Sequence, residues 1–336
     1  LRFLYETRYK SEYSELERPR VVDVKLNVDL FPDIRRADIQ GRLVLINRTD
    51  GVMRQLQVTV DPDVTINELR FPNATLKRND SEVGFRVYQL DTPLPPGGST
   101  DCHFRLSVIS RGFVNHDSDV KLLANGTFFG DGDYLPRFGY VPWVEIDDVN
   151  ERKERGLPPR ARLPDVDDVA ARQIGRSRDS DRVTFEATVS TSSDQIALAP
   201  GRLQREWLED GRRFFHYKMD EKIFYAFSIL SGRYEVARDH WNDVAIEIYF
   251  HKAHHFNIDR MIESVKKSLE YYSKNFSPYQ HKLVRIVEFP CYRTFAQSFP
   301  TTIPFSESAH FIDDIRDPDM IDKVFYITAH EVAHQW

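Results

Sequence analysis

The strongest chemical pattern in the sequence lies at residues 328–336, which read Thr-Ala-His-Glu-Val-Ala-His-Gln-Trp. Residues four apart lie on the same face of a helix, so His330 and His334 can both reach one metal ion. Glu331 lies about 100° further round the same helix, where its carboxylate can reach a water on the metal without becoming a ligand. The spacing therefore predicts two ligands of a zinc ion and a general base.

This combination of side chains is suited to hydrolysis. Zinc lowers the pKa of a bound water to about 7 and polarises a carbonyl group, and Glu331 can take the proton from that water. The expected reaction is the attack of the water on the polarised carbonyl. A helix with two incidental histidines is the alternative interpretation of the same pattern.

A buried helix must position these residues. Asp317 and Pro318 are predicted to be its N-cap and its first residue, because proline is favoured at the first helical position. Apolar residues then recur at steps of three and four, which predicts one buried face. The residues of that face are Ile321, Val324, Phe325, Thr328 and Val332.

Length, net charge, cysteine content and the lengths of apolar runs restrict the classes of protein to which the chain can belong. The 336 residues leave room for two domains, and the net charge of -6 gives no reason to expect a nucleic-acid partner. Cys102 and Cys291 are too few and too far apart to define a disulfide framework, so a free, buried cysteine is expected at each position. No apolar run reaches the roughly 18 residues that a membrane-spanning helix needs.

Three regions are predicted along the chain. Residues 1–20 are expected to form a charged lead-in helix or linker. Residues 21–236 are predicted to form an all-β domain, a saddle-shaped sheet or sandwich, because short segments alternate apolar and polar residues. Within it, residues 145–182 are rich in charge and are predicted to be an exposed insertion. The alternating segments begin at Val22, Leu43, Leu56, Val83 and Cys102.

Residues 237–336 show longer periods. A helix is predicted to begin after Asn257 and to end near 274–275, and a buried strand is predicted over 283–289. His251, His254 and His255 precede this helix. A second metal cluster is conceivable there, and a polar loop that enters a helix explains the three histidines as well.

Several motifs together resemble the aminopeptidase N-type gluzincin metallopeptidases. They are Tyr-Tyr-x-x-Asn-Phe-x-Pro-Tyr at 271–279, Glu-Phe-Pro at 288–290 and His-Glu-x-x-His-Gln-Trp at 330–336. The segments 257–261, 295–300 and 303–307 are similar to the peptidase-like domain of large bacterial membrane proteins that carry transporter-permease segments. The resemblance implies a saddle-like β domain followed by the start of an α/β, thermolysin-like catalytic domain.

The same resemblance implies a set of roles for the motif. It makes His330 and His334 ligands of one zinc ion in the complete protein, and Glu331 the general base. The third zinc ligand of the family is a glutamate on the following helix, beyond Trp336. We therefore expect this chain to be a truncated and largely inactive piece.

The resemblance also points to substrate contacts. Aminopeptidases of the family bind the free amine of a peptide through a glutamate in a Gly-x-Met-Glu-Asn segment. Residues 295–300 correspond to that segment, and Gln297 and Ser298 lie near the expected place. Their oxygens can accept a hydrogen bond from an ammonium group but lack the charge that strengthens it. Glu307 is a possible substitute, and a glutamate at a strand end is the alternative.

The sequence thus predicts a zinc-dependent metallopeptidase, of aminopeptidase type, that hydrolyses peptide substrates. The alternative is a non-catalytic module of a membrane transport protein that binds a peptide or a partner. By resemblance, the chain is expected to be a soluble domain, tethered to membrane segments that lie outside it.

Overall fold

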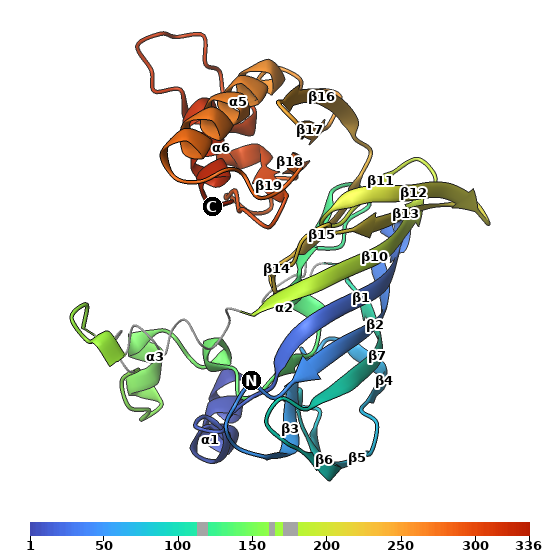
Figure 1. Cartoon of the computed structure of the whole chain (residues 1–336), viewed down its shortest axis with the longest axis vertical. Helices are drawn as coiled ribbons and strands as arrows, with labels where there is room; N and C mark the ends of the chain where they lie inside the picture. The colour runs from blue at the N-terminus through green and yellow to red at the C-terminus, as the bar shows by residue number, and fades with distance from the viewer. Residues whose placement is uncertain (113–119, 161–164, 171–180) are drawn as a thin grey trace. The chain divides into compact units, whose positions relative to one another are not determined.

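The computed structural model describes residues 1–112, 120–160, 165–170 and 181–336 (Figure 1). The chain divides into two compact units. Unit 1 comprises Leu1–Val24, Gln40–Leu106 and Gly132–Val183, and unit 2 comprises Lys25–Ile39, Ser107–Asp131 and Thr184–Trp336. The predicted all-β region 21–236 therefore contributes residues to both units.

The described residues are mainly β, as predicted. The largest sheet has eight strands in the order β12-β13-β10-β1-β2-β7-β4, with β14 paired to β10. Along β1, residues 24, 26, 28 and 30 are buried, which confirms the alternation seen in the sequence. The strands are β1 (Arg20–Phe31), β2 (Arg36–Ile46), β4 (Thr65–Arg70), β7 (Ser99–Ile109), β10 (Arg182–Ser192), β12 (Arg202–Glu209), β13 (Arg212–Lys218) and β14 (Ile223–Phe224).

Unit 1 contains a second sheet, of order β5-β6-β3-β9. Its strands are β3 (Met53–Thr59), β5 (Ala74–Asp80), β6 (Phe85–Leu94) and β9 (Arg137–Phe138). The predicted lead-in helix is α1 (Arg2–Tyr13), and its buried tyrosines Tyr5, Tyr9 and Tyr13 pack around Phe85. Since these rings form an aromatic core, α1 is part of the folded unit rather than a solvated linker.

The charged segment that follows is partly buried. The short elements α2 (Asp131–Tyr134) and η2 (Pro142–Val144) precede it, and it contains α3 (Val149–Glu154). Glu145, Ile146 and Arg152 are all buried, and Glu145 accepts a hydrogen bond from Lys10 at 2.8 Å. These three residues differ from the predicted exposed insertion, because Lys10 and Glu6 of α1 pair with Glu145 and Arg152, whereas most of residues 147–160 and all of 165–170 are exposed. Residues 161–164 and 171–180 lie outside the described residues.

Unit 2 contains two further sheets. One has the order β11-β15-β8, from β11 (Ile196–Leu198), β15 (Ser228–Gly232) and β8 (Thr127–Gly130). The other has the order β16-β17-β18-β19, from β16 (Glu235–Trp241), β17 (Val244–Phe250), β18 (Leu283–Phe289) and β19 (Thr302–Ser306). In the second sheet β17, β18 and β19 run parallel, so their carboxyl ends lie at one edge.

Two helices share a core with this sheet (Figure 1). They are α5 (Ile258–Asn275) and α6 (Lys323–Ala333). The unit also contains two short helical elements, η1 (Pro32–Ile34) and η3 (Glu307–Phe311). The predicted helix after Asn257 and the predicted strand 283–289 are confirmed, and every residue of β18 is buried, as is typical of a central parallel strand. The thermolysin-like form of this region remains a prediction.

Asn257 connects the start of α5 to another segment of the unit. It precedes α5, but its side chain makes no capping bond to the helix and donates instead to the carbonyls of Phe311 and Asp313, both at 2.9 Å. It therefore joins the start of α5 to the segment that leads into α6.

Within the described ranges, no helix has the length and apolar character needed to cross a bilayer.

Candidate functional site on helix α6

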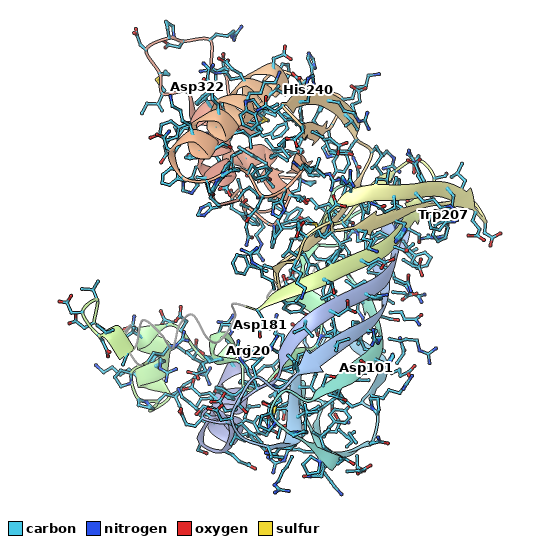
Figure 2. All side chains as sticks on the ribbon, in the orientation of Figure 1. Arg20, Asp101, Asp181, Trp207, His240 and Asp322 are labelled. Atoms are coloured by element: carbon cyan, nitrogen blue, oxygen red, sulfur yellow. The ribbon has the colours of Figure 1, made fainter. Side chains whose placement is uncertain are left out.

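Asp322 fixes the start of the helix that carries the histidine motif. Its carboxylate accepts a hydrogen bond from the backbone N–H of Phe325 at 2.8 Å, and it pairs with Arg260 of α5 at 2.6 Å (Figure 2). The prediction of Asp317 as the cap is wrong, because its carboxylate accepts from the N–H of Asp319 in a separate turn. Ile321 is accordingly 77% exposed and lies outside the buried face.

The buried face of α6 sets the direction of the motif. Val324, Thr328 and Val332 are fully buried, and the two valines belong to the core shared with α5 and the sheet. Their spacing of four leaves His330 and His334 on the exposed side of the helix. The core thus aims both imidazole rings toward solvent.

The two histidines are arranged as a pair of metal ligands would be. Their Nε2 atoms lie 3.2 Å apart, and their rings are nearly perpendicular. A tetrahedral zinc ion with Zn–N bonds of 2.0–2.1 Å holds two nitrogens about 3.3 Å apart. The pair therefore fits two of the ligand positions around a zinc ion.

Glu331 lies in a different environment from His330 and His334, which are exposed. It is 6% exposed, and among the described residues no hydrogen-bond donor reaches its carboxylate. Burial raises its pKa, while the positive charges that His330 and His334 can carry lower it. A buried carboxylate with raised proton affinity beside two candidate ligands has the properties of a general base.

Gln335 connects the end of α6 to the loop at 297–301. Its amide nitrogen donates to the side chain of Ser298 and to the carbonyl of Phe299 at 2.8 Å. Its amide oxygen accepts from the N–H of Thr301 at 3.0 Å. Sequence reasoning gave Gln335 no separate role, and no local pattern could have shown it, because these partners lie 34 or more residues away.

The predicted substrate residues occupy two different positions. Ser298 is half-buried and held by Gln335, so it lies beside the end of α6. Gln297 is exposed, and its backbone N–H donates to the carbonyl of Pro304 at 3.1 Å. The described contacts include none between the Gln297 side chain and the motif residues, and both roles remain predictions.

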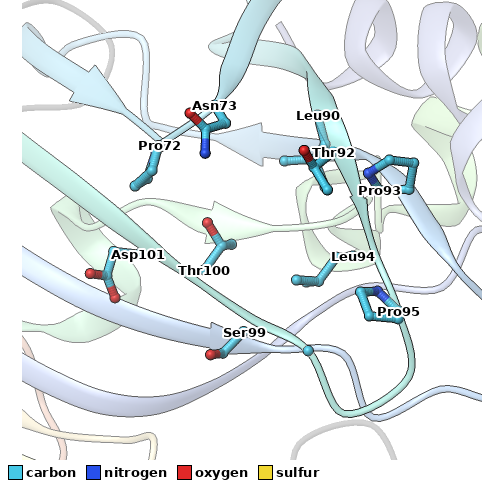
Figure 3. Close-up of a pocket in the computed structure, with 11 residues that line it drawn as sticks. Pro72, Asn73, Leu90, Thr92, Pro93, Leu94, Pro95, Ser99, Thr100 and Asp101 are labelled. Atoms are coloured by element: carbon cyan, nitrogen blue, oxygen red, sulfur yellow. The ribbon is translucent and has the colours of Figure 1, made fainter.

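A hollow in unit 1 is a second candidate site (Figure 3). It has a volume of about 450 Å³ and lies between the turn at 72–73 and the chain at 90–101. Prolines and uncharged polar groups line it, and Asp101 is its one ionisable side chain. It thus lacks the paired acid, base or ligand groups that catalysis needs, and α6 is the better candidate site.

Comparison with known proteins adds one finding. No family model matches the chain. Over 76 residues, however, the chain is 36% identical to "Probable aminopeptidase 1" of Sulfurisphaera tokodaii. The chain is similar to an aminopeptidase. The match covers 22% of this chain and 10% of that protein, so the chain spans about a tenth of its relative and the similarity supports a peptidase relationship.

Proposed function

We propose that the chain carries part of the active site of a zinc-dependent metallopeptidase of aminopeptidase type. The observation that carries the proposal is the 3.2 Å separation of the Nε2 atoms of His330 and His334, which suits two ligands of one zinc ion. When bound, zinc supplies a water of lowered pKa and polarises the carbonyl of a peptide substrate. The similarity to an aminopeptidase supports this choice of reaction.

Glu331 is the proton acceptor in this proposal. The helix holds its carboxylate beside His330, and the core side of α6 buries it. Because burial raises its pKa, the carboxylate binds a proton more strongly than an exposed glutamate does. It can therefore take a proton from the attacking water and return it to the leaving amine.

Ser298 and Gln297 are proposed to contact the amino end of the substrate. Gln335 holds Ser298 near the end of α6, and Gln297 is free to turn at the surface. Neutral acceptors bind an ammonium group without the added strength of a charge. Peptides with a blocked amino terminus should therefore compete better here than in an enzyme that uses a glutamate.

The test compares Glu331→Gln with Glu270→Gln, an exposed glutamate of α5 that serves as a matched control. Zinc content and hydrolysis of aminoacyl and acetyl-aminoacyl fluorogenic substrates are measured on the complete protein that contains residues 1–336. Glu331→Gln should retain zinc and lose activity by roughly a hundredfold or more, since a general base contributes about 10²–10⁴. Glu270→Gln should match the unchanged protein.

Two results would count against the proposal. Equal hydrolysis by the Glu331→Gln variant and its control would remove Glu331 as the base. Retained zinc with no hydrolysis of any peptide would instead favour the non-catalytic module that binds peptides. A His330→Ala variant should lose zinc from α6 whether the protein is a peptidase or the non-catalytic module. This loss distinguishes both of them from a protein that binds no metal on α6.

A further inference from the structure

A second group of possible metal ligands lies at the carboxyl ends of three neighbouring strands. His251 directly follows β17, Glu288 is the sixth residue of β18, and Glu307 directly follows β19. The three strands are parallel and adjacent, with Phe289 of β18 opposite Ser306 of β19. Ligands of α/β sheets bind beyond the carboxyl ends of the strands, so this edge is a favoured place for a site.

The side chains converge there. One ligand atom each from His251, Glu288 and Glu307 lies within 4.8 Å of the others. The Nδ1 atom of His254 contacts Glu288 and lies 3.9 Å from the carboxylate of Glu307. Two imidazole rings and two carboxylates thus face one small volume. Since a tetrahedral zinc ion with bonds of about 2.0–2.2 Å holds its donor atoms about 3.3–3.6 Å apart, the half-exposed Glu307 must rotate toward the other ligands to close the set.

The buried carboxylate of Glu288 is the clearest sign that this group has a role beyond packing. Its side chain is fully buried, and it accepts a hydrogen bond from the backbone N–H of His251 at 2.6 Å. Its carboxylate also contacts Nδ1 of His254, and a carboxylate oxygen of Glu307 lies within 4.8 Å of it. Two carboxylates so close together leave negative charge that a cation would neutralise.

Further contacts hold the candidate ligands in place. The hydroxyl of Tyr234 donates to the carbonyl of Glu288 at 3.0 Å, and its ring packs against the ring of His251. The amide of Asn125 lies 3.5 Å from Nδ1 of His251, and the N–H of Cys291 donates to Glu307 at 3.2 Å. Such outer contacts orient the ligands of metal sites.

We propose that His251, Glu288 and Glu307 form a binding site for one divalent transition-metal ion of the zinc class, with His254 as a fourth ligand. The mixture of imidazole and carboxylate donors favours such an ion over magnesium or calcium, which prefer oxygen ligands alone. This site shares no residue with the pair on α6 and does not depend on the function proposed for that pair.

The test uses the whole chain with His330→Ala and His334→Ala, so that α6 cannot bind the metal. Zinc binding is measured by titration calorimetry and elemental analysis, and cobalt binding by its visible absorption. The background variant should bind one zinc ion per chain. Adding His251→Ala or Glu307→Gln should weaken binding by roughly a hundredfold or more, since even outer contacts change metal affinity 10–100-fold.

His255→Ala is the matched control, because His255 is an exposed histidine of the same loop and lies outside the cluster. It should bind zinc as the background does. Glu307 is half-exposed at a strand end, so Glu307→Gln should fold, which circular dichroism and the metal-free melting temperature check. Absence of zinc binding in the background, or equal binding by the Glu307→Gln and His255→Ala variants, would overturn the proposal. Since α6 is inactivated throughout, neither result bears on the peptidase proposal.

Discussion

Buried carboxylates are treated differently in the two units. In unit 1, Glu6 is 3% exposed, and both of its oxygens bind Arg152 at 2.8 Å. Arg152 uses its other donors on the carbonyls of Ile146 and Pro158. In unit 2, Glu288 has histidines and a second carboxylate as neighbours, and no donor within the described residues reaches the carboxylate of Glu331.

The pKa values follow this difference. Burial raises the pKa of Glu6, but the bonds from Arg152 and Lys10 outweigh it, so the value falls below the usual 4.5. The pKa values of Glu288 and Glu331 are raised, because burial outweighs their partners. A completed ion pair is typical of a structural role, whereas perturbed and incompletely paired groups are more common at functional sites. The contrast therefore separates structural from candidate functional carboxylates.

The largest expected effect comes from breaking the completed pair. Arg152→Ala leaves Glu6 buried without its main partner, which should lower the free energy of unfolding by about 3–5 kcal/mol. Arg155→Ala is the control on the same helix, because the Arg155–Glu151 pair is exposed and should contribute less than about 0.5 kcal/mol. Urea unfolding measures both. Similar values for the two variants would show that Glu6 and Arg152 do not depend on each other.

The same pair predicts the sign of a pH effect. Because the pKa of Glu6 is lower in the folded state than in the unfolded state, its contribution is complete above about pH 4.5. It should be lost as the pH falls through the folded value. The test is the difference in unfolding free energy between the unchanged protein and Glu6→Gln, followed from pH 7 to pH 3. A difference that stays constant over this range would contradict the assignment.

Unit 2 also contains a buried polar side chain whose hydrogen bonds are complete. The amide nitrogen and the amide oxygen of Gln335 both have partners, which is typical of a structural role. Gln335→Ala leaves the buried N–H of Thr301 unpaired and should cost about 1–3 kcal/mol. Gln280→Ala is the control, since Gln280 is exposed and its side chain donates to the carbonyl of Gln335. Thermal unfolding compares the two. A destabilisation by Gln280→Ala as large as that by Gln335→Ala would mean that the buried network is not what holds this loop.

Local patterns in the sequence were sufficient to predict part of the fold and one of the two candidate sites. The periods of α5 and β18 match their structures, and the spacing of His330 and His334 needs only one helical turn to bring them together. The strands β4 and β5 were not predicted, because none of their residues is buried and no apolar alternation marks them. Strands of this kind are defined by their partners rather than by their own sequence.

Local patterns could not predict the cluster of His251, Glu288 and Glu307 at the strand ends, for a related reason. His251 and Glu288 are 37 residues apart, and only the parallel register of the sheet brings them together. The loop histidines did give a signal, because a second metal cluster was one interpretation of them. The carboxylates that complete the group could be found only after β17, β18 and β19 were placed side by side.

The smallest expected effect tests the paired carboxylate at the start of α6. Asp322→Ala removes a helix cap and should lower the unfolding free energy by about 1 kcal/mol. Asp317→Ala is the matched control, because this residue stabilises only an exposed turn and should change stability by less than about 0.5 kcal/mol. Chemical denaturation followed by circular dichroism measures both. A larger loss of stability in Asp317→Ala than in Asp322→Ala would mean that α6 begins at Asp317. The orientation of the His330 and His334 rings described above would then be wrong.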